Sequence, residues 1–353
     1  MALTQAEKAM VEKALATGSG NMAVPLTQRD CLCLIAVIAS DLGVYNRFPF
    51  LPDNPPNFFT ENWDDTGIDT HPNHRQLLAE LREHSPDSIS YFACLASLLK
   101  SRKKYDNILK CQPVPTMDQV GPRALLQYGT MSPRMLAHFL LWRKWLFDLD
   151  NRSGQETGYL FEPIIAHAIG GTPVSAAKSP IKRHDNNKKG RQVDCIKGAL
   201  AYEFKIRLTI AASGQGRWGE ELAFPVDCRM SGYQPVLVVL DPTENPKLTD
   251  LIKAFEGNDG LVFVGENAWK HLEQQAGETM AIFLEKYVKV PLQEVIGNTP
   301  VGMGEITMRM EERFLSITVE GETYAHERQE DANAINCDGL SFPIGIEDEI
   351  PGP

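Results

Sequence analysis

Apolar residues recur at helical spacing through much of the first 150 residues. Ser132 followed by Pro133 favours a helix start. A stretch rich in Pro and Asn, residues 48–65, predicts a long ordered loop. The segments with helical spacing, a period typical of amphipathic helices, are 28–45, 74–84, 88–104 and 132–149. The pattern therefore predicts a mainly helical N-terminal region over residues 1–150.

Strand-like runs begin to alternate with helical ones after residue 150. Residues 151–171 predict a loop, then a helix, then a stop at glycine. The strand-like segments are short runs of β-branched and other apolar residues, at 192–197, 200–206, 235–241 and 260–265. The strand-like segments 235–241 and 260–265 are each followed by a segment with helical spacing of apolar residues, at 245–258 and 266–288. This order predicts an α/β fold with a mixed central sheet flanked by helices.

The C-terminal part carries a different pattern. Residues 304–320 alternate apolar and polar positions, which predicts a hairpin with Ile306, Met308 and Met310 on one face. The remainder, from about residue 327, is acidic and irregular, which is typical of a surface tail.

Composition narrows the functional classes only slightly. The 353 residues are 43% hydrophobic with a formal net charge of -11, so a general basic surface for nucleic acid is missing, although a local one would suffice. The seven cysteines include no CxxC pair, which argues against a disulfide framework or a zinc ribbon. Cys195 and Cys228 are expected to be small buried residues. Without a secretory leader pattern or an apolar run of about 20 residues, we expect a cytoplasmic protein.

Candidate chemistry lies in the predicted hairpin VDCIKGALAYEFK, residues 193–205. Residues i and i+2 of a strand share a face, so Glu203 and Lys205 point the same way. A turn near Gly198 would bring Asp194 opposite them. Neighbouring carboxylates repel each other unless a cation lies between them, and oxygen ligands suit Mg²⁺. A lysine there can hold an attacking water. The alternative is a solvated polar face, because ExK tripeptides also occur by chance.

Two flanking segments could contact DNA. Residues 178–192 form a basic run in an acidic chain, and phosphate neutralisation competes with a solvated loop as its interpretation. Residues 209–222 are glycine-rich and carry side chains suited to base edges or to stacking, although a core role is the more frequent use of a Trp. The candidate DNA-contacting residues are Lys182, Arg183, Lys188, Lys189, Arg191, Gln215, Arg217 and Trp218.

Asp194, Glu203, Phe204 and Lys205 match the D…(D/E)xK signature, so the chain resembles the PD-(D/E)XK nuclease superfamily. The resemblance in element order covers roughly residues 156–290. Val193 departs from the pattern, because the family often has Pro before the Asp.

That superfamily often supplies a further acid from the helix before the hairpin. Glu162 fits this place, with Glu156 as the competing candidate. Because Pro163 is tolerated best in a first helical turn, Glu162 is expected near a helix N-terminus. An ordinary first-turn carboxylate, favoured by the helix dipole, is the alternative reading.

Within the superfamily, residues 201–222 and 224–248 resemble the ApaLI-like type II restriction endonucleases. This resemblance implies a homodimer that cuts double-stranded DNA at a short palindrome, GTGCAC for an ApaLI-type enzyme, with Asp194 and Glu203 binding Mg²⁺. A cognate DNA methyltransferase would be encoded alongside. The implied organisation is a helical region for dimer or DNA contacts, a nuclease domain with the C-terminal hairpin, and an acidic tail, over residues 1–150, 151–326 and 327–353.

Two other readings remain open at this point. A PD-(D/E)XK repair or recombination nuclease that recognises DNA structure would carry the same residues. A non-catalytic DNA-binding module could keep the same fold, although the intact Asp, Glu and Lys argue against it. A small-molecule α/β enzyme is a weaker rival, because no GxGxxG or GxxxxGK[ST] loop is present.

Overall fold

The structure is a computed structural model that describes two compact units. The structure describes residues 3–16, 24–49, 51, 54–59, 63, 73–206, 215–298, 300, 302, 304–311 and 313–329. Of these, residues 123, 155, 156, 158, 159 and 215–217 are described by their backbone alone. One unit comprises residues 1–14, 27–97 and 159–298, and the other residues 15–26, 98–158 and 299–353. Each unit therefore draws on segments from both sides of residue 150. No helix in the described ranges is long and apolar enough to cross a membrane.

A five-stranded mixed sheet organises the first unit, which confirms the predicted α/β class. Its strands lie in the order of the chain: β1 (Thr172–Val174), β2 (Val193–Lys197), β3 (Leu200–Lys205), β4 (Gln234–Val239) and β5 (Leu261–Val264). The first three pair antiparallel, and β3 pairs parallel with β4 as β4 does with β5. The parallel strands read as unbroken apolar runs because helices cover both faces.

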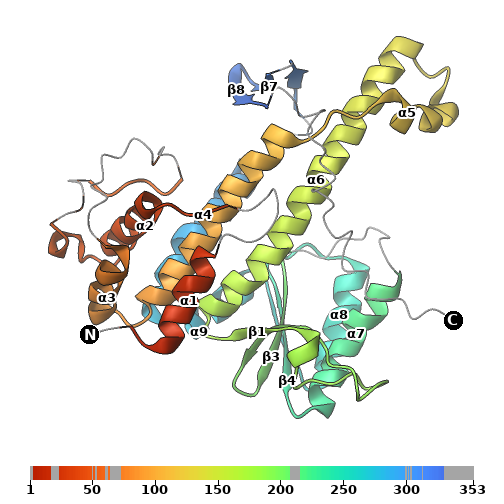
Figure 1. Ribbon diagram of the computed structural model, residues 1–353. Coiled ribbons are helices and arrows are strands. Elements are labelled where there is room, and N and C mark those ends of the chain that lie inside the picture. Colours follow the sequence, from red (N-terminus) through yellow and green to blue (C-terminus); the bar gives the residue numbers. More distant parts are fainter. Residues whose placement is uncertain are drawn as a thin grey trace. The chain divides into compact units, whose positions relative to one another are not determined.

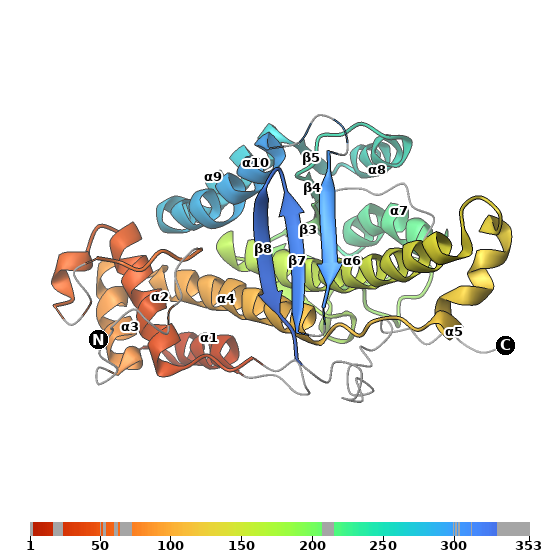
Figure 2. The ribbon, with the colours of Figure 1, turned by 90° about the horizontal axis from the view of Figure 1, so that it is seen from above.

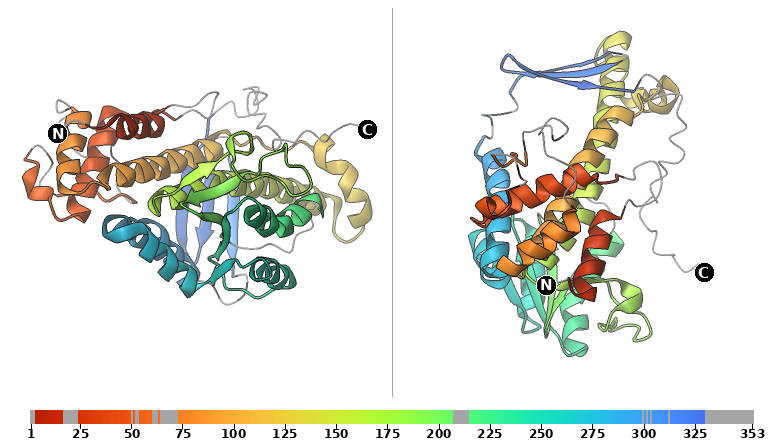
Figure 3. Two further views of the ribbon diagram at one scale, coloured as in Figure 1. Left: turned by 90° about the horizontal axis from the view of Figure 1, so that it is seen from below. Right: turned by 60° about the vertical axis from the view of Figure 1, so that its left-hand side comes forward.

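Helices pack on both faces of this sheet. The helices α7 (Gln215–Met230) and α8 (Pro246–Glu256) lie on one face and α9 (Glu266–Leu284) on the other (Figures 1 and 3). On the α7 and α8 side, Phe224 and Phe255 stack within a core that includes Leu237 and Val239. After α9 the chain continues through a π-helical turn (Glu285–Lys289) into α10 (Val290–Gly297).

The N-terminal helices of this unit confirm the predicted helical region. They are α1 (Gln5–Leu15), α2 (Gln28–Asp41), α3 (His74–His84) and the start of α4 (Ser88–Cys111). A capping box between Thr27 and Asp30 sets the beginning of α2, and its apolar residues 31–39 are buried. Asp41 accepts hydrogen bonds from the hydroxyls of Tyr91 and Tyr287, which ties α2 to α4 and to the turn after α9.

The helix before the hairpin is longer than the sequence pattern predicts. A single helix, α6 (Pro133–Ala168), replaces the expected loop after residue 150, so the prediction that Glu162 lies near a helix N-terminus is wrong. Pro163 lies inside the helix, where its missing N–H leaves the carbonyl four residues earlier without its usual helical donor. The hydroxyls of Ser153 and Thr157 donate to carbonyls one turn earlier, at Leu149 and Ser153, so the polar stretch is accommodated without a break.

The second unit contains the later part of α4, the first part of α6, α5 (Met117–Val120), the 3₁₀ helix η3 (Gly121–Gln127) and a separate sheet. The predicted hairpin is present as β6 (Ile306–Met310) and β7 (Phe314–Val319), and β8 (Glu322–Glu327) adds an unpredicted third antiparallel strand (Figure 2). Its sequence ETYAHE lacks an apolar alternation, because most of the strand is exposed at the sheet edge.

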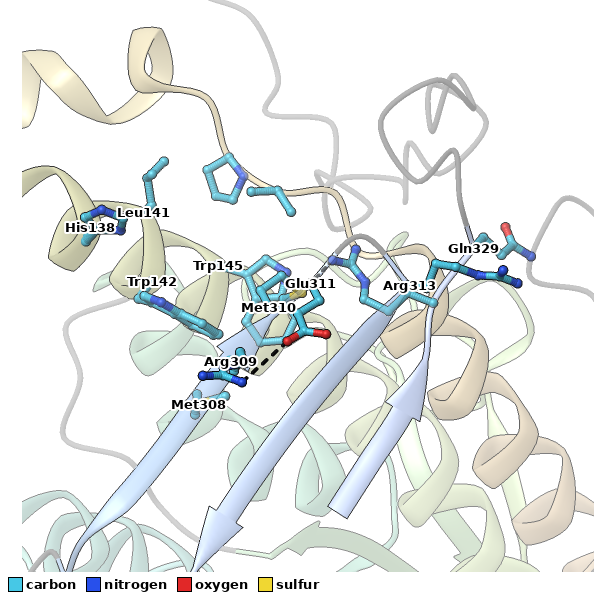
Figure 4. A pocket seen from close by; sticks show the side chains of 13 residues that line it. His138, Leu141, Trp142, Trp145, Met308, Arg309, Met310, Glu311, Arg313 and Gln329 are labelled. Atoms are coloured by element: carbon cyan, nitrogen blue, oxygen red, sulfur yellow. Dashed lines mark hydrogen bonds and ion pairs between the residues drawn. The ribbon is translucent and has the colours of Figure 1, made fainter. Parts of the chain in front are cut away.

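Tryptophans of α6 face this small sheet. Trp145 is buried with Leu109 and Leu315, and Trp142, Met308 and Met310 pack against that cluster. A cavity of about 810 Å³ lies beside these side chains (Figure 4). The core of the second unit is thus formed between α4, α6 and the three strands.

Candidate active site

The β2–β3 hairpin brings the predicted acidic and basic residues together. Cys195 pairs with Tyr202 across the two antiparallel strands. One step further along this register, Asp194 comes opposite Glu203, and residues opposite each other share a face. Asp194 is anchored there, because its Oδ2 accepts a hydrogen bond from the backbone N–H of Phe204 at 2.9 Å.

Lys205 lies between two glutamates. Its Nζ is 2.7 Å from Oε1 of Glu203 and 3.6 Å from Oε1 of Glu221, and all three side chains are mostly buried. Burial alone would lower the pKa of Lys205, but Glu203, Glu221 and Asp194 together raise that pKa above its ordinary value. The lysine is therefore held as an ammonium ion at neutral pH.

The carboxyl groups of Glu162 and Asp194 are in surroundings that disfavour their charged forms. Burial and then the neighbouring Glu203 raise the pKa of Glu162 to about 7, against the lowering effect of Lys205. Burial, Glu203 and Glu162 raise the pKa of Asp194 well above its usual range. Although α6 does not begin near Glu162, this helix therefore brings the Glu162 carboxyl into the electrostatic field of the hairpin. The side chain of the competing Glu156 lies outside the described side chains.

A cation would relieve this repulsion. No group of three His, Cys, Asp or Glu side chains in the described ranges is gathered closely enough to enclose a metal ion. Asp194 and Glu162 nevertheless lie near enough to Glu203 for burial and its charge to raise the pKa of each, so negative charge accumulates in this partly buried region. Its donors are carboxylate oxygens, the type preferred by Mg²⁺, which commonly keeps several waters and takes few protein ligands. The residues present thus fit a hydrated divalent cation.

Glu221 is a site residue that the sequence analysis missed. It lies in α7, which packs on the sheet face that carries Glu203 and Lys205. The only sequence signal was the pair of acids Glu220 and Glu221 in the glycine-rich segment. Helical spacing alone does not specify which of the two faces the hairpin.

The basic segment folds back on itself between Lys182 and Gly190 and is anchored on α7. The anchor is Asp227, a buried residue that accepts hydrogen bonds from the backbone N–H of His184 at 2.7 Å and from its Nδ1 at 2.6 Å. Arg191 donates to Asp227 at 2.5 Å and to the carbonyl of Glu220, with its guanidinium over the ring of Phe224.

The predicted DNA-contacting residues of this segment separate into two groups. Arg191 is only 8% exposed and serves the anchor, so the structure does not present it to a ligand. Arg183 is partly exposed and bonded to Glu220 at 2.5 Å, while Lys182 has its Nζ on the carbonyl of Ser179. Lys188 and Lys189 are exposed at the tip.

The glycine-rich segment is not a loop throughout. Helix α7 begins at Gln215, so Gly216 lies within a helix, and residues 207–214 lie outside the described residues. The side chains of Gln215 and Arg217 are not described. Trp218 packs against the core beside the sheet, with the ammonium of Lys247 5.4 Å from its ring centroid. This placement matches the core role that competed with DNA stacking.

The cysteines near the site are structural. Cys195 and Cys228 are fully buried, as predicted. Burial raises the pKa of the Cys195 thiol to about 12 and raises that of Cys228 as well. Neither thiol is therefore a nucleophile at neutral pH.

Comparison with known proteins places this chain in a class of DNA-cleaving enzymes. The model of the ApaLI-like restriction endonucleases matches residues 61–289, and the chain belongs to that family. It is 44% identical to the type II restriction enzyme ApaLI of Acetobacter pasteurianus, in an alignment that covers 92% of this chain and 93% of that enzyme. No solved structure matches the chain. The family resemblance predicted from the sequence is thereby confirmed, and with it a restriction endonuclease that acts on DNA.

Proposed function

We propose that this chain is a type II restriction endonuclease of the PD-(D/E)XK kind, which hydrolyses double-stranded DNA with Mg²⁺ at the β2–β3 hairpin. The observation that carries the proposal is the arrangement of Lys205 at 2.7 Å from Glu203, with Asp194 on the adjacent strand and Glu162 near enough to interact electrostatically with both acids. Family membership independently supports cleavage of DNA as the reaction.

Each residue has a role that follows from its charge. Asp194 and Glu203 would hold the Mg²⁺, and Glu162 would accept a hydrogen bond from one of its waters. When bound, the ion supplies Lewis-acid polarisation of the phosphodiester and lowers the pKa of a bound water. Lys205, held protonated, donates hydrogen bonds that orient the attacking water and stabilise negative charge developing on the phosphate oxygens. In-line attack breaks the bond to the 3′ oxygen and leaves a 5′-phosphate.

Recognition and assembly extend this proposal. A homodimer would match the two-fold symmetry of a palindromic site, for which the ApaLI resemblance favours GTGCAC. Lys182, Arg183, Lys188 and Lys189 would contact phosphates beside the hairpin. The helical region would supply dimer or further DNA contacts. A cognate methyltransferase would protect host DNA without forming a stable complex.

Cleavage mapping tests the proposed function. The purified protein, incubated with unmethylated plasmid DNA and about 10 mM Mg²⁺, is expected to yield discrete fragments whose sequenced ends share one palindrome. Chelation by EDTA is expected to abolish the products. A short duplex carrying GTGCAC and a matched duplex with one base pair changed test the hexamer. Cleavage confined to junctions, flaps or ends would overturn this function in favour of a structure-specific nuclease, and binding without turnover in favour of a DNA-binding module.

Cation binding can be measured without activity. A carboxyl with a raised pKa in the folded protein binds its proton more tightly than in the unfolded chain, so stability falls as pH rises toward the folded pKa. For Glu162 that pKa is about 7. A divalent cation replaces the lost proton, so Mg²⁺ or Ca²⁺ is expected to raise the melting temperature by about 2 °C or more at about pH 8, and by less at about pH 6. The Asp194→Asn variant is expected to lose this rise; an equal rise in the variant would place the cation elsewhere.

Glu221 is expected to position Lys205. Substitution of Glu221 by Gln keeps the size of the side chain but removes the charge that lies 3.6 Å from Nζ of Lys205. Of the two ion pairs of Lys205, the one with Glu203 then remains. We expect kcat to fall about tenfold with little change in KM for DNA, because the lost contact orients a catalytic group and not the substrate. Single-turnover cleavage with Glu220→Gln as the neighbouring control measures this. Equal losses in both variants would indicate a general effect on α7.

A further inference from the structure

Helix α6 of the second unit carries an apolar face that the described residues leave exposed. Met135, Phe139, Leu146 and Phe147 are 63%, 49%, 40% and 60% exposed. The guanidinium of Arg143 lies 5.6 Å from the centroid of the Phe139 ring. A contiguous apolar surface of this kind on a soluble protein marks a binding face.

The other faces of this helix already have partners. Leu136 and Leu140 pack with Val120 of α5, and Trp142 and Trp145 pack toward the three-stranded sheet (Figure 4). An amphipathic helix on a protein surface has one apolar stripe. The exposed stripe is thus additional to those that the fold of this unit requires.

The 3₁₀ helix η3 of the same unit also exposes apolar residues. Leu125 and Leu126 within it and Tyr128 just after it are 80%, 94% and 73% exposed. Aromatic residues, Met and Arg are the types enriched at protein–protein interfaces, whereas surfaces that contact DNA are more polar and strongly positive. The composition therefore favours a protein partner over DNA for this face.

We propose that a second copy of this chain packs on this face, with the two α6 helices antiparallel. Arg143 lies three residues before Leu146, and Asp150 lies three residues after Phe147, all four on exposed positions. In a two-fold arrangement centred between Leu146 and Phe147, Arg143 of each copy faces Asp150 of the other. The charges are complementary only in the antiparallel orientation.

The sizes of the side chains complement each other in the same register. Phe139 of one copy would face Gly154 of the other, where even an added Cβ would meet no atom within 4 Å. The hydroxyls of Ser153 and Thr157, next along this half of α6, are bonded to carbonyls of their own helix. The large side chain of Phe139 thereby meets a position that has no side chain.

This surface specifies the homodimer included in the proposed function, but it can be tested by self-association alone. In sedimentation equilibrium the full-length protein is expected to have a mass near twice 39.3 kDa. Arg143→Glu and Asp150→Arg each create like-charge contacts and are expected to weaken the dimer by about 10- to 100-fold. The double variant restores opposite charges and is expected to recover most of the affinity. Circular dichroism melts would confirm that the variants remain folded.

Cross-linking provides a second measurement of the same register. Leu146→Cys lies next to the proposed two-fold axis and is expected to form a disulfide-linked dimer under mild oxidation, whereas Glu322→Cys on exposed β8 and the wild-type protein are not. A monomeric wild type at micromolar concentration would overturn the proposal. So would a dimer that both charge variants leave intact, or cross-linking of the Glu322→Cys variant equal to that of the Leu146→Cys variant. DNA cleavage by an obligate monomer would refute the interface while leaving the proposed activity in place.

Discussion

Lys205→Ala is expected to lower the rate of DNA cleavage by at least about 10²- to 10³-fold, the usual consequence of removing one preorganised donor from a developing charge. The ammonium of Lys205 lies 2.7 Å from Glu203, and three acidic residues keep it protonated. Its loss removes the group that orients water and counters charge at the scissile phosphate. Single-turnover cleavage at saturating Mg²⁺ would measure the effect.

The hairpin supplies a matched control for that experiment. Lys197 is on the adjacent strand β2, and its Nζ donates to the backbone and side-chain oxygens of Gln275, away from the acidic cluster. Lys197→Ala is expected to cleave DNA at nearly the normal rate. DNA binding measured in Ca²⁺ should persist in Lys205→Ala, because the lysine is expected to act mainly in the transition state. Equal losses of cleavage in the two variants would show that the Lys205 effect is structural.

Asp227→Ala is expected to reduce the free energy of unfolding by about 3 kcal/mol or more, since it leaves a buried charge without its partner. Arg191 would keep the carbonyl of Glu220 and the face of Phe224, and His184 would lose the two hydrogen bonds that it donates to Oδ1 of Asp227. Denaturant unfolding would measure the loss. Hydrogen exchange is expected to show faster exchange across residues 178–192, because this carboxylate anchors that segment to α7.

The same segment provides the control. Asp185 is exposed and its substitution by Ala is expected to change stability by less than about 0.5 kcal/mol. If Lys188 and Lys189 contact DNA as proposed, Asp227→Ala should also weaken DNA binding, because it releases the segment that carries them. A stability of Asp227→Ala equal to that of Asp185→Ala would show that the buried network contributes nothing to the fold.

Local patterns were sufficient for much of this protein. The β2–β3 hairpin was predictable because strand periodicity fixes which side chains share a face, and a turn near Gly198 fixes which residues become opposite. The parallel strands were visible because burial on both faces demands continuous apolar runs, as in residues 235–241. The sequence alone did not distinguish a catalytic ExK tripeptide from an ordinary polar face of a strand. The distance between Lys205 and Glu203 and the coupling of Asp194 to Glu162 depend on packing.

The errors arose where a local signal had a non-local outcome. Pro163 predicts a helix start, yet α6 runs through it, because the apolar positions on both sides of the polar stretch are held by packing. The basic residues 182–191 appear alike in the sequence, but Arg191 is buried by an aspartate 36 residues further along the chain. For Trp218 the sequence left DNA contact and a core role open, and packing beside the sheet favours the core role.

The sequence by itself determined the α/β class, the hairpin with Asp194, Glu203 and Lys205, and the family, because all of these depend on residues close together in the chain. Only the tertiary structure decided that Glu221 faces Lys205, that Asp227 neutralises Arg191, and that one apolar stripe of α6 stays exposed among the described residues of its unit. Each of these depends on how elements distant in sequence pack together, and packing decides which charged or apolar side chains are covered and which remain exposed to a ligand or a second copy.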